Sequence, residues 1–266
     1  MLNHLRSGVT ALALGLAAPA ALAAGDALEP KHHHWHHDGA FGGFEQAQLQ
    51  RGYQVYKEVC SSCHSMKLLA YRHLGDKGAP FYMEEYPNPN DNPVVKAIAA
   101  EAIITDGPDE WGEMFERPGK TSDYFAAPFP NEQAARAANG GAYPPDLSVI
   151  VHARHHGADY IYSLLAGYKD PPEDVELQPG AYYNPYFPGG QLAMPQPLYD
   201  DFVSYEDGTE ASVEQMAEDV TAFLAWAADP KLEARKQLGS AAIMYLAAFA
   251  FVLYISYKAI WRNVEH

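Results

Sequence analysis

The chain has 266 residues, 48% of them hydrophobic, and a formal net charge of −16. This composition is too apolar for a disordered protein and too polar for a polytopic membrane protein, so it predicts one sizeable domain with terminal segments. An acidic surface repels a phosphate backbone, which excludes nucleic acid as a partner and favours a basic protein. The two cysteines, Cys60 and Cys63, lie too close together to form a disulfide framework.

The first 23 residues have the pattern of a secretory signal. Arg6 supplies a positive charge, residues 9–18 are apolar, and Ala21-Leu22-Ala23 offers a small-residue cleavage site. The apolar stretch is too short to cross ~30 Å of hydrocarbon, which argues against an N-terminal membrane helix. We therefore expect residues 1–23 to be a signal peptide and residues 24–236 to be an exported domain.

A histidine-rich tract follows the predicted signal. Residues 31–37 read Lys-His-His-His-Trp-His-His, and Gly39, Gly42 and Gly43 come directly after them. Tracts of this kind can bind transition metals. We expect a solvated, mobile segment here, with metal binding as the alternative.

The next predicted element carries the chemistry of the chain. Apolar side chains at helical spacing between residues 49 and 59 predict a helix over about residues 44–66. Near its end stands Cys60-Ser61-Ser62-Cys63-His64, the C-x-x-C-H pattern of covalent haem attachment. Two thiols one helical turn apart can bond the two vinyl groups on one porphyrin edge, and the adjacent histidine can ligate the iron. We therefore expect one covalent c-type haem, used to move single electrons, with His64 as an axial ligand.

Two other interpretations of the cysteine pair are weaker. A thioredoxin-type dithiol needs a βαβ pattern around it, and none is present. A zinc site needs about four ligands, which would require a histidine from the tract in addition to His64.

The middle of the chain predicts short helices between long loops. Residues 80–145 and 170–200 are rich in Pro, Gly and Asn, whereas residues 147–168 regain helical character. Ser212 and Gln215 form a capping-box pattern before an apolar stripe from Val213 to Ala227, and Pro230 ends that helix. No segment has a persuasive strand pattern. We expect a mainly α fold, a c-type cytochrome domain with long irregular loops plus one C-terminal transmembrane helix.

The second axial ligand must come from elsewhere in the chain. Methionine ligation raises the potential of a haem relative to a second histidine. Of the seven methionines, Met83, Met114 and Met194 lie in suitable segments, while Met216 fits core packing better. Met194 is favoured because its loop is bounded by glycines and Pro195, which can hold it stiffly against a haem face. Plain packing of Met194 is one alternative, and the other is a second histidine, His152, His155 or His156.

Residues 237–257 predict a membrane anchor. No charged residue lies between Leu238 and Tyr257, and about 20 helical residues span ~30 Å. Because the preceding domain is exported, we expect residues 258–266 to form a cytoplasmic tail. The chain would then cross the inner (cytoplasmic) membrane once, with its haem domain in the periplasm. The flanking charges give this orientation little support, since Lys231, Arg235 and Lys236 lie on the outer side.

Several segments together give the chain a family resemblance. They are residues 48–59 before the haem motif, residues 134–148, and residues 153–155 together with 159–165. With Met194-Pro195 and the single C-terminal anchor, these segments resemble cytochrome c1, the haem subunit of the bacterial-type cytochrome bc1 complex. The resemblance covers nearly the whole mature chain. The histidine tract departs from the family pattern, and the chain lacks the cysteines for the extra disulfide of some bacterial members.

The resemblance implies a set of haem contacts. It makes Met194 the axial ligand opposite His64, and it pairs Arg154 with a haem propionate. It places Tyr160 and Asn139 near the haem and packs Pro145 and Phe187 on it. For Tyr160 and Phe187, a plain core position is the alternative.

The resemblance also implies the role and the partners. The haem would take electrons from the Rieske iron–sulfur protein and pass them to a soluble or membrane-anchored cytochrome c, without catalysis by this chain alone. Cytochrome b, membrane lipid and a dimeric complex are further expected partners. Acidic runs at residues 80–117 and 200–219 are candidate docking surfaces for a basic cytochrome c. The rivals are a membrane-anchored cytochrome outside any bc1 complex, a haem enzyme or gas sensor with an open iron site, and a metal-buffering protein built on the histidine tract.

Overall fold

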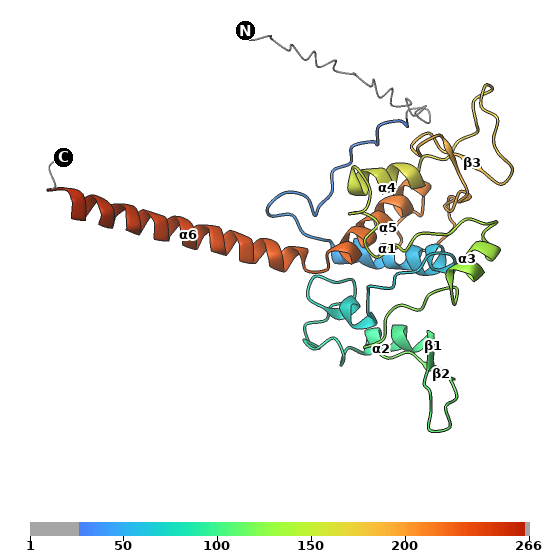
Figure 1. Cartoon of the computed structure of the whole chain (residues 1–266), viewed down its shortest axis with the longest axis horizontal. Helices are drawn as coiled ribbons and strands as arrows, with labels where there is room; N and C mark the ends of the chain where they lie inside the picture. Colours follow the sequence, from blue (N-terminus) through green and yellow to red (C-terminus); the bar gives the residue numbers. More distant parts are fainter. Residues whose placement is uncertain (1–26, 264–266) are drawn as a thin grey trace, which may run out of the picture.

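The computed structural model describes residues 27–263, so the predicted signal peptide and the last three residues of the tail lie outside the described residues. Most of the regular structure is helical, and the element order alternates helices with long loops (Figure 1). The mainly α class predicted from the sequence is confirmed. The helices are α1 (Gln46–Glu58), α2 (Pro93–Ala100), α3 (Glu132–Ala138), α4 (Gly157–Leu165), α5 (Val213–Ala228) and α6 (Leu232–Trp261).

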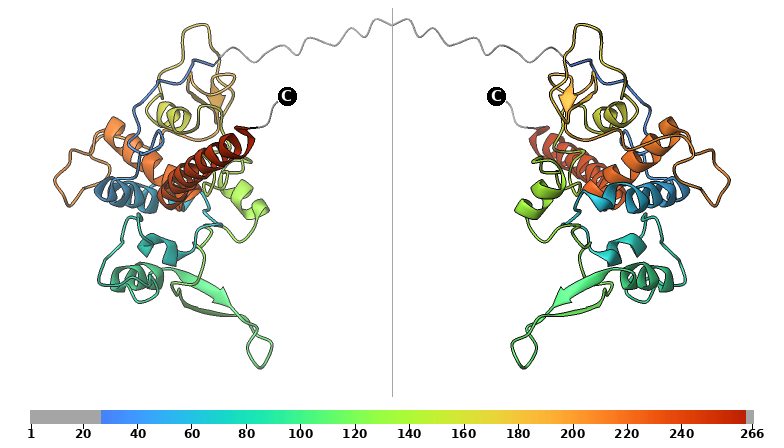
Figure 2. Two further views of the ribbon diagram at one scale, coloured as in Figure 1. Left: turned by 90° about the vertical axis from the view of Figure 1, so that its left-hand side faces the viewer. Right: turned by 90° about the vertical axis from the view of Figure 1, so that its right-hand side faces the viewer.

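Two small antiparallel ribbons correct the expectation that the chain has no strands. Strands β1 (Ile103–Asp106) and β2 (Phe115–Pro118) pair in one ribbon, and β3 (Tyr182–Tyr183) and β4 (Gln191–Leu192) pair in the other. Strands of two to four residues are too short to show a periodic pattern in the sequence. The β1–β2 ribbon projects away from the rest of the domain (Figure 2).

The core is built where α1 packs against α5. Phe223 and Trp226 of α5 are fully buried, and so is Met216, as its place on an apolar stripe predicts. The two helices approach closely at Gly52, where a Cβ atom would lie only 2.0 Å from the carbonyl oxygen of Asp219. Only glycine tolerates such an approach, so Gly52 sets the distance between the two helices.

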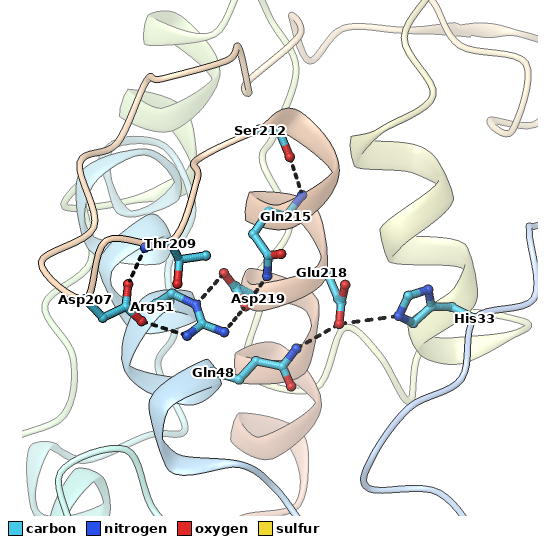
Figure 3. Close-up of polar contacts among 9 residues, drawn as sticks. All are labelled: His33, Gln48, Arg51, Asp207, Thr209, Ser212, Gln215, Glu218 and Asp219. Carbon is cyan, nitrogen blue, oxygen red and sulfur yellow. Dashed lines mark hydrogen bonds and ion pairs between the residues drawn. The ribbon is translucent and has the colours of Figure 1, made fainter.

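A polar network clamps the same helix pair (Figure 3). Arg51 on α1 donates from Nε and Nη2 to the two carboxylate oxygens of Asp219 on α5, at 2.9 and 3.1 Å. It also donates to Asp207 at 2.8 Å. The Asp219 side chain is fully buried, and Gln215 donates to it at 3.1 Å. The buried carboxylate is therefore bound by hydrogen-bond donors from both helices.

Before α6, two helix boundaries and one cap differ from the predicted ones. Helix α1 ends at Glu58, so the C-x-x-C-H motif begins in a separate 3-10 turn, Cys60–Ser62, and Cys63 and His64 follow that turn. Only residues 157–165 of the predicted segment 147–168 form α4. At α5 the Ser212 hydroxyl accepts from the Gln215 backbone at 3.2 Å, but the Gln215 side chain turns to Asp219. The predicted capping box is thus half formed, because the buried carboxylate competes for the glutamine side chain.

Helix α6 is 30 residues long and leaves the domain as a single projecting rod (Figure 1). Among residues 27–263 it is the one helix long and apolar enough to cross a membrane, and its apolar window is not buried inside the protein. It begins at Leu232, before the predicted anchor of residues 237–257. The first six residues of α6, which are mostly polar, extend the helix from the apolar segment toward the domain.

The histidine tract packs on the domain through Trp35, His33 and His37, which corrects the prediction of a solvated segment in part, because Lys31, His32, His34 and His36 stay exposed. Trp35 is 5% exposed, and its Nε1 donates to Asp159 Oδ1 of α4 at 2.7 Å. The backbone N–H of His33 donates to the same oxygen at 3.2 Å. The His37 ring stacks on Phe44 with centroids 4.8 Å apart. Within the described residues, no group of three or more histidine, cysteine or acidic side chains could hold a metal ion.

Candidate haem site

The attachment turn presents two cysteines that are not joined to each other. The backbone N–H groups of Cys63 and His64 both donate to the Cys60 carbonyl, at 3.2 and 2.9 Å, which closes a tight turn directly after α1. Both thiols are free. Burial raises the pKa of the Cys60 thiol to about 12, and the nearby Cys63 adds to the shift. Cys60 is therefore a neutral thiol at neutral pH.

The His64 ring is oriented by one hydrogen bond. Its Nδ1 lies 2.8 Å from the carbonyl oxygen of Pro145, an atom that can only accept. Nδ1 therefore carries the proton, and Nε2 keeps the lone pair that a metal needs. Burial lowers the pKa of His64, which favours this neutral ring. The donor set and its orientation fit the proximal ligand of a covalently attached haem.

The segment that holds His64 is fixed to the attachment turn by a local clamp. Asp146 accepts from the Ser65 hydroxyl at 2.8 Å and from the Lys67 backbone at 2.9 Å. Leu147 N donates to the Ser65 carbonyl at 2.8 Å, and the Ser148 hydroxyl accepts from Leu68 N at 3.0 Å. Burial opposes ionisation of Asp146, but these hydrogen bonds outweigh it and lower its pKa. The clamp sets where the Pro145 carbonyl meets His64.

Three predicted haem contacts share one cavity. Arg154, Tyr160 and Phe187 line a cavity of about 490 Å³, together with His155 and His156. The chain turns sharply before α4, since His156 adopts a left-handed conformation with φ of 63°. This turn places a cation beside aromatic rings, and burial raises the pKa of Tyr160. The cavity is mostly apolar, with the cation Arg154 and the carboxylate Glu29 in its lining, and Cys60, Cys63, His64 and Met194 do not line it. Arg154 could pair with a carboxylate of a flat cofactor that reaches this cavity.

Met194 lies two residues beyond β4, partly buried and packed against the core. The Tyr168 hydroxyl donates to its carbonyl at 3.0 Å, which holds the backbone of this loop. The other two candidate methionines lie elsewhere. Met114 is 61% exposed near the tip of the β1–β2 ribbon, and Met83 is in the loop before α2.

Asn139 has a local role in the structure. It terminates α3, and its side-chain amide donates to the Ala135 carbonyl at 2.7 Å. Asn184 is the more heavily used amide near the cavity. It is fully buried, donates to the Leu164 carbonyl at 2.7 Å and accepts from the Tyr186 N–H at 3.1 Å. It thereby fixes the loop that carries Phe187.

The structure thus groups the predicted residues in two sets. His64 and Pro145 are in direct contact, and Arg154, Tyr160 and Phe187 share the cavity. Sequence reasoning missed the supporting residues Asp146, Ser148, Tyr168 and Asn184. Asp146 and Ser148 lie in residues 134–148, a segment that carries the family resemblance, and this resemblance could have identified them. No local sequence pattern indicates the roles of Tyr168 and Asn184.

Comparison with known proteins gives a consistent result. The model of the Cytochrome C1 family matches residues 35–264. The chain is 49% identical to cytochrome c1 heme protein 1 of Arabidopsis thaliana mitochondria, over 88% of this chain and 76% of the relative. It is 49% identical to the mitochondrial cytochrome c1 of Saccharomyces cerevisiae, over 94% and 78%. A protein named cytochrome b/c1 from Bradyrhizobium diazoefficiens is 43% identical over 96% of this chain and 40% of its own length. The attachment turn, the oriented histidine and these matches together show that the chain belongs to the cytochrome c1 family.

Proposed function

We propose that this chain, as a covalent-haem electron-transfer subunit of a cytochrome bc1 complex, carries a single haem c with His64 and Met194 as axial ligands. Cys60 and Cys63 would supply the two thioether bonds. The observation that carries the proposal is the 2.8 Å contact between His64 Nδ1 and the Pro145 carbonyl. It leaves Nε2 as the ligand atom directly after a pair of free thiols.

When bound, the haem supplies a one-electron couple between ferric and ferrous iron. The chain's own residues set its surroundings. Pro145 fixes the tautomer of His64, and this hydrogen bond would make Nε2 a better electron-pair donor to the iron. Arg154 neutralises a carboxylate of the cofactor, while Tyr160 and Phe187 exclude water from its face. Asn139 ends α3 beside this region and keeps its backbone in place.

The proposed topology combines α6 with the sequence signals at both ends. Residues 1–23 are the signal peptide, residues 24–236 the periplasmic domain, residues 237–257 the anchor and residues 258–266 the cytoplasmic tail. In this arrangement cytochrome b and lipid contact the anchor, the Rieske protein is the electron donor, and a basic cytochrome c is the acceptor. The complex is a dimer of such units. The supporting observation is the exposed apolar helix α6.

The two acidic runs differ in how free their carboxylates are. Within residues 200–219, Asp207 and Asp219 bind Arg51, and Asp200 accepts from the Val213 backbone. On the β1–β2 ribbon, Glu110, Glu113 and Glu116 are exposed, and the ribbon projects into solvent (Figure 2). We propose the ribbon as the docking surface for the basic acceptor, because Glu110, Glu113 and Glu116 form no ion pair in the described residues, whereas Asp106 of the same ribbon pairs with Arg117.

Visible spectroscopy tests the ligand set. The wild-type complex should show a low-spin haem with the weak far-red band of thioether ligation. Met194→Leu should lose that band and gain carbon monoxide binding, whereas Met83→Leu should retain the wild-type spectrum. An unchanged Met194→Leu spectrum places the sixth ligand elsewhere, and His152, His155 and His156 are then the candidates. Ready binding of carbon monoxide by the wild type would favour an open-site haem protein.

Reduction kinetics of a basic cytochrome c test the docking surface. The rate should fall steeply as ionic strength rises. Changing Glu110, Glu113 and Glu116 together to Gln should flatten this dependence. The matched control changes Asp201, Glu206 and Glu210 of the other run to the corresponding amides, which removes the same charge. It should change the dependence of the rate on ionic strength little. A rate independent of salt contradicts electrostatic docking, and equal effects of the two sets contradict the choice of the ribbon.

A further inference from the structure

A second cavity lies where the domain meets helix α6, away from the haem residues. Its volume is about 440 Å³, and it is formed by the turn before Ala79 and by the start of α6. The lining residues come from two segments, Arg72 to Gly78 and Pro230 to Ala234, together with Phe44. None of the residues assigned to the haem takes part in it.

Three cations line this cavity. They are Arg72, Lys77 and Lys231, and within the described part of the chain none of them forms an ion pair. Two neighbouring cations at the same end of α6 are already bound. Arg235 pairs with Asp229, and Lys236 donates to the carbonyls of His37 and Gly42. The cavity therefore gathers three basic groups that form no ion pair within 4 Å in the described residues, although Arg72 and Lys231 lie near enough to Asp76 to affect its pKa.

The acidic groups in the cavity cancel this charge only in part. Glu233 accepts from the Phe44 backbone N–H at 2.8 Å, so its carboxylate is already engaged. Asp76 is the other carboxylate, and His73 has its pKa lowered by burial and is neutral. Three cations against two carboxylates, one of them hydrogen-bonded to the backbone, leave the cavity with an excess of positive charge. It is suited to an anion.

The position of the cavity along α6 identifies the anion. Lys231 precedes α6, and the uncharged stretch begins at Leu238. Seven residues of helix rise about 10 Å. The headgroup layer on each side of a bilayer is roughly 5–8 Å thick, being the difference between the full thickness and the hydrocarbon core. With the uncharged stretch in the hydrocarbon, the lining residue Ala234 lies about 6 Å above it, within the headgroup layer, and Lys231 lies just outside that layer. The inner end of the cavity is therefore at the level of the lipid headgroups.

We propose that this cavity binds the phosphate of an anionic phospholipid in the leaflet on the haem side of the membrane. Arg72 supplies a planar fork for two phosphate oxygens, and Lys77 and Lys231 supply point charges. The lipid then fills the corner between the domain and α6 and restricts their relative motion. This inference rests on the proposed crossing of the membrane by α6.

Native mass spectrometry of the purified bc1 complex released from nanodiscs tests the proposal. The nanodiscs contain phosphatidylglycerol in phosphatidylcholine, and bound phosphatidylglycerol is counted per complex. Near a membrane each basic side chain contributes about a factor of five in affinity for anionic lipid. Arg72→Gln/Lys77→Gln/Lys231→Gln should therefore lose one tightly bound phosphatidylglycerol, and Lys77→Gln/Lys231→Gln should weaken its retention on the order of 25-fold. The control Lys169→Gln removes an exposed lysine elsewhere on the domain and should retain the full count.

Three results would overturn the proposal. They are an unchanged lipid count in both variants, equal loss of phosphatidylcholine, and displacement of the lipid by millimolar inorganic phosphate, which would assign a free-anion site. The haem spectrum and resistance to alkaline carbonate extraction are measured on the same samples. If the variants keep a normal haem spectrum, stay in the membrane and lose no lipid, the lipid site is refuted while the proposed function stands. Extraction of the wild-type chain would instead refute the proposed anchoring.

Discussion

The clamp between α1 and α5 makes the stability of the domain depend on Arg51. Asp219 is fully buried and Arg51 is 16% exposed, so Arg51→Met leaves an ionised carboxylate in the core with only the neutral groups of Gln215 and Tyr205 beside it. Breaking a buried pair from one side costs about 3–5 kcal/mol of unfolding free energy. For a domain of this size that corresponds to a fall in the thermal midpoint on the order of 10 °C. Far-UV circular dichroism of the detergent-solubilised chain measures it.

The matched control is Arg136→Met. Arg136 forms an exposed pair with Glu132 on α3, with side chains 48% and 50% exposed. Such pairs contribute about 0.5 kcal/mol or less, so the midpoint should hardly move. The double variant Arg51→Met/Asp219→Leu replaces both charges with apolar groups and should recover most of the lost stability. Equal effects of Arg51→Met and Arg136→Met would refute the argument from burial.

The pH dependence of Arg51→Met gives a second, independent test. Burial raises the pKa of Asp219, and hydrogen bonding to Arg51 opposes that rise. Without Arg51 the pKa of the folded state should rise further above its unfolded value near 4. The folded variant then binds a proton more tightly than the unfolded chain, so its stability falls as pH increases through that raised pKa. The deficit relative to wild type should therefore shrink on acidification, and Asp219→Asn in the same background should abolish this trend.

Three further predictions follow from single contacts. Gly52→Ala should lower the thermal midpoint by the equivalent of about 1–3 kcal/mol, because its Cβ would meet the Asp219 carbonyl at 2.0 Å, and an unchanged midpoint would contradict this. Asn92→Ala should lower the unfolding free energy by about 2–3 kcal/mol in the same assay, since buried Asn92 caps α2 and donates to the Phe81 carbonyl. The control Asn88→Ala, at an exposed position, should lower it by less than about 1 kcal/mol. Hydrogen bonding to Asp159 raises the pKa of His32, so proteolytic protection of residues 31–37 should be full below about pH 6.5 and decline through the raised pKa. His32→Gln should remove that decline.

The sequence predicted the elements whose signals are local. The apolar stripe of α5, its Ser212 cap, the end before Pro230 and the long apolar helix all appear in the structure. The prediction that the histidine tract is solvated was wrong at Trp35 and at the backbone of His33, for a physical reason. Composition indicates solvation, but Trp35 and the backbone of His33 find a carboxylate on α4, and burial of one indole outweighs the polarity of its neighbours.

For the candidate site, too, the sequence predicts the residues of the local motif but not those that act from distant positions. The C-x-x-C-H motif specifies its own chemistry within five residues, so Cys60, Cys63 and His64 needed no tertiary information. The Pro145 carbonyl that orients His64 is 81 positions away, and a backbone acceptor has no sequence signal at all. The family resemblance implied that Pro145 packs on the haem, but it did not predict the hydrogen bond to His64. Residues such as Asn184, which act through long-range hydrogen bonds, lie beyond both kinds of reasoning.

The close helix pair connects stability to the proposed electron transfer. Gly52 removes a side chain at the crossing, which brings the backbone of α5 against α1. That approach buries Asp219, and Arg51, the residue before Gly52, is then the cation within reach of its carboxylate. A glycine that weakens an isolated helix by about 1 kcal/mol is therefore retained for packing. Helix α1 ends just before Cys60, so the clamp fixes the origin of the attachment turn. Under the proposed ligation, this would limit how far His64 moves when the iron changes its charge.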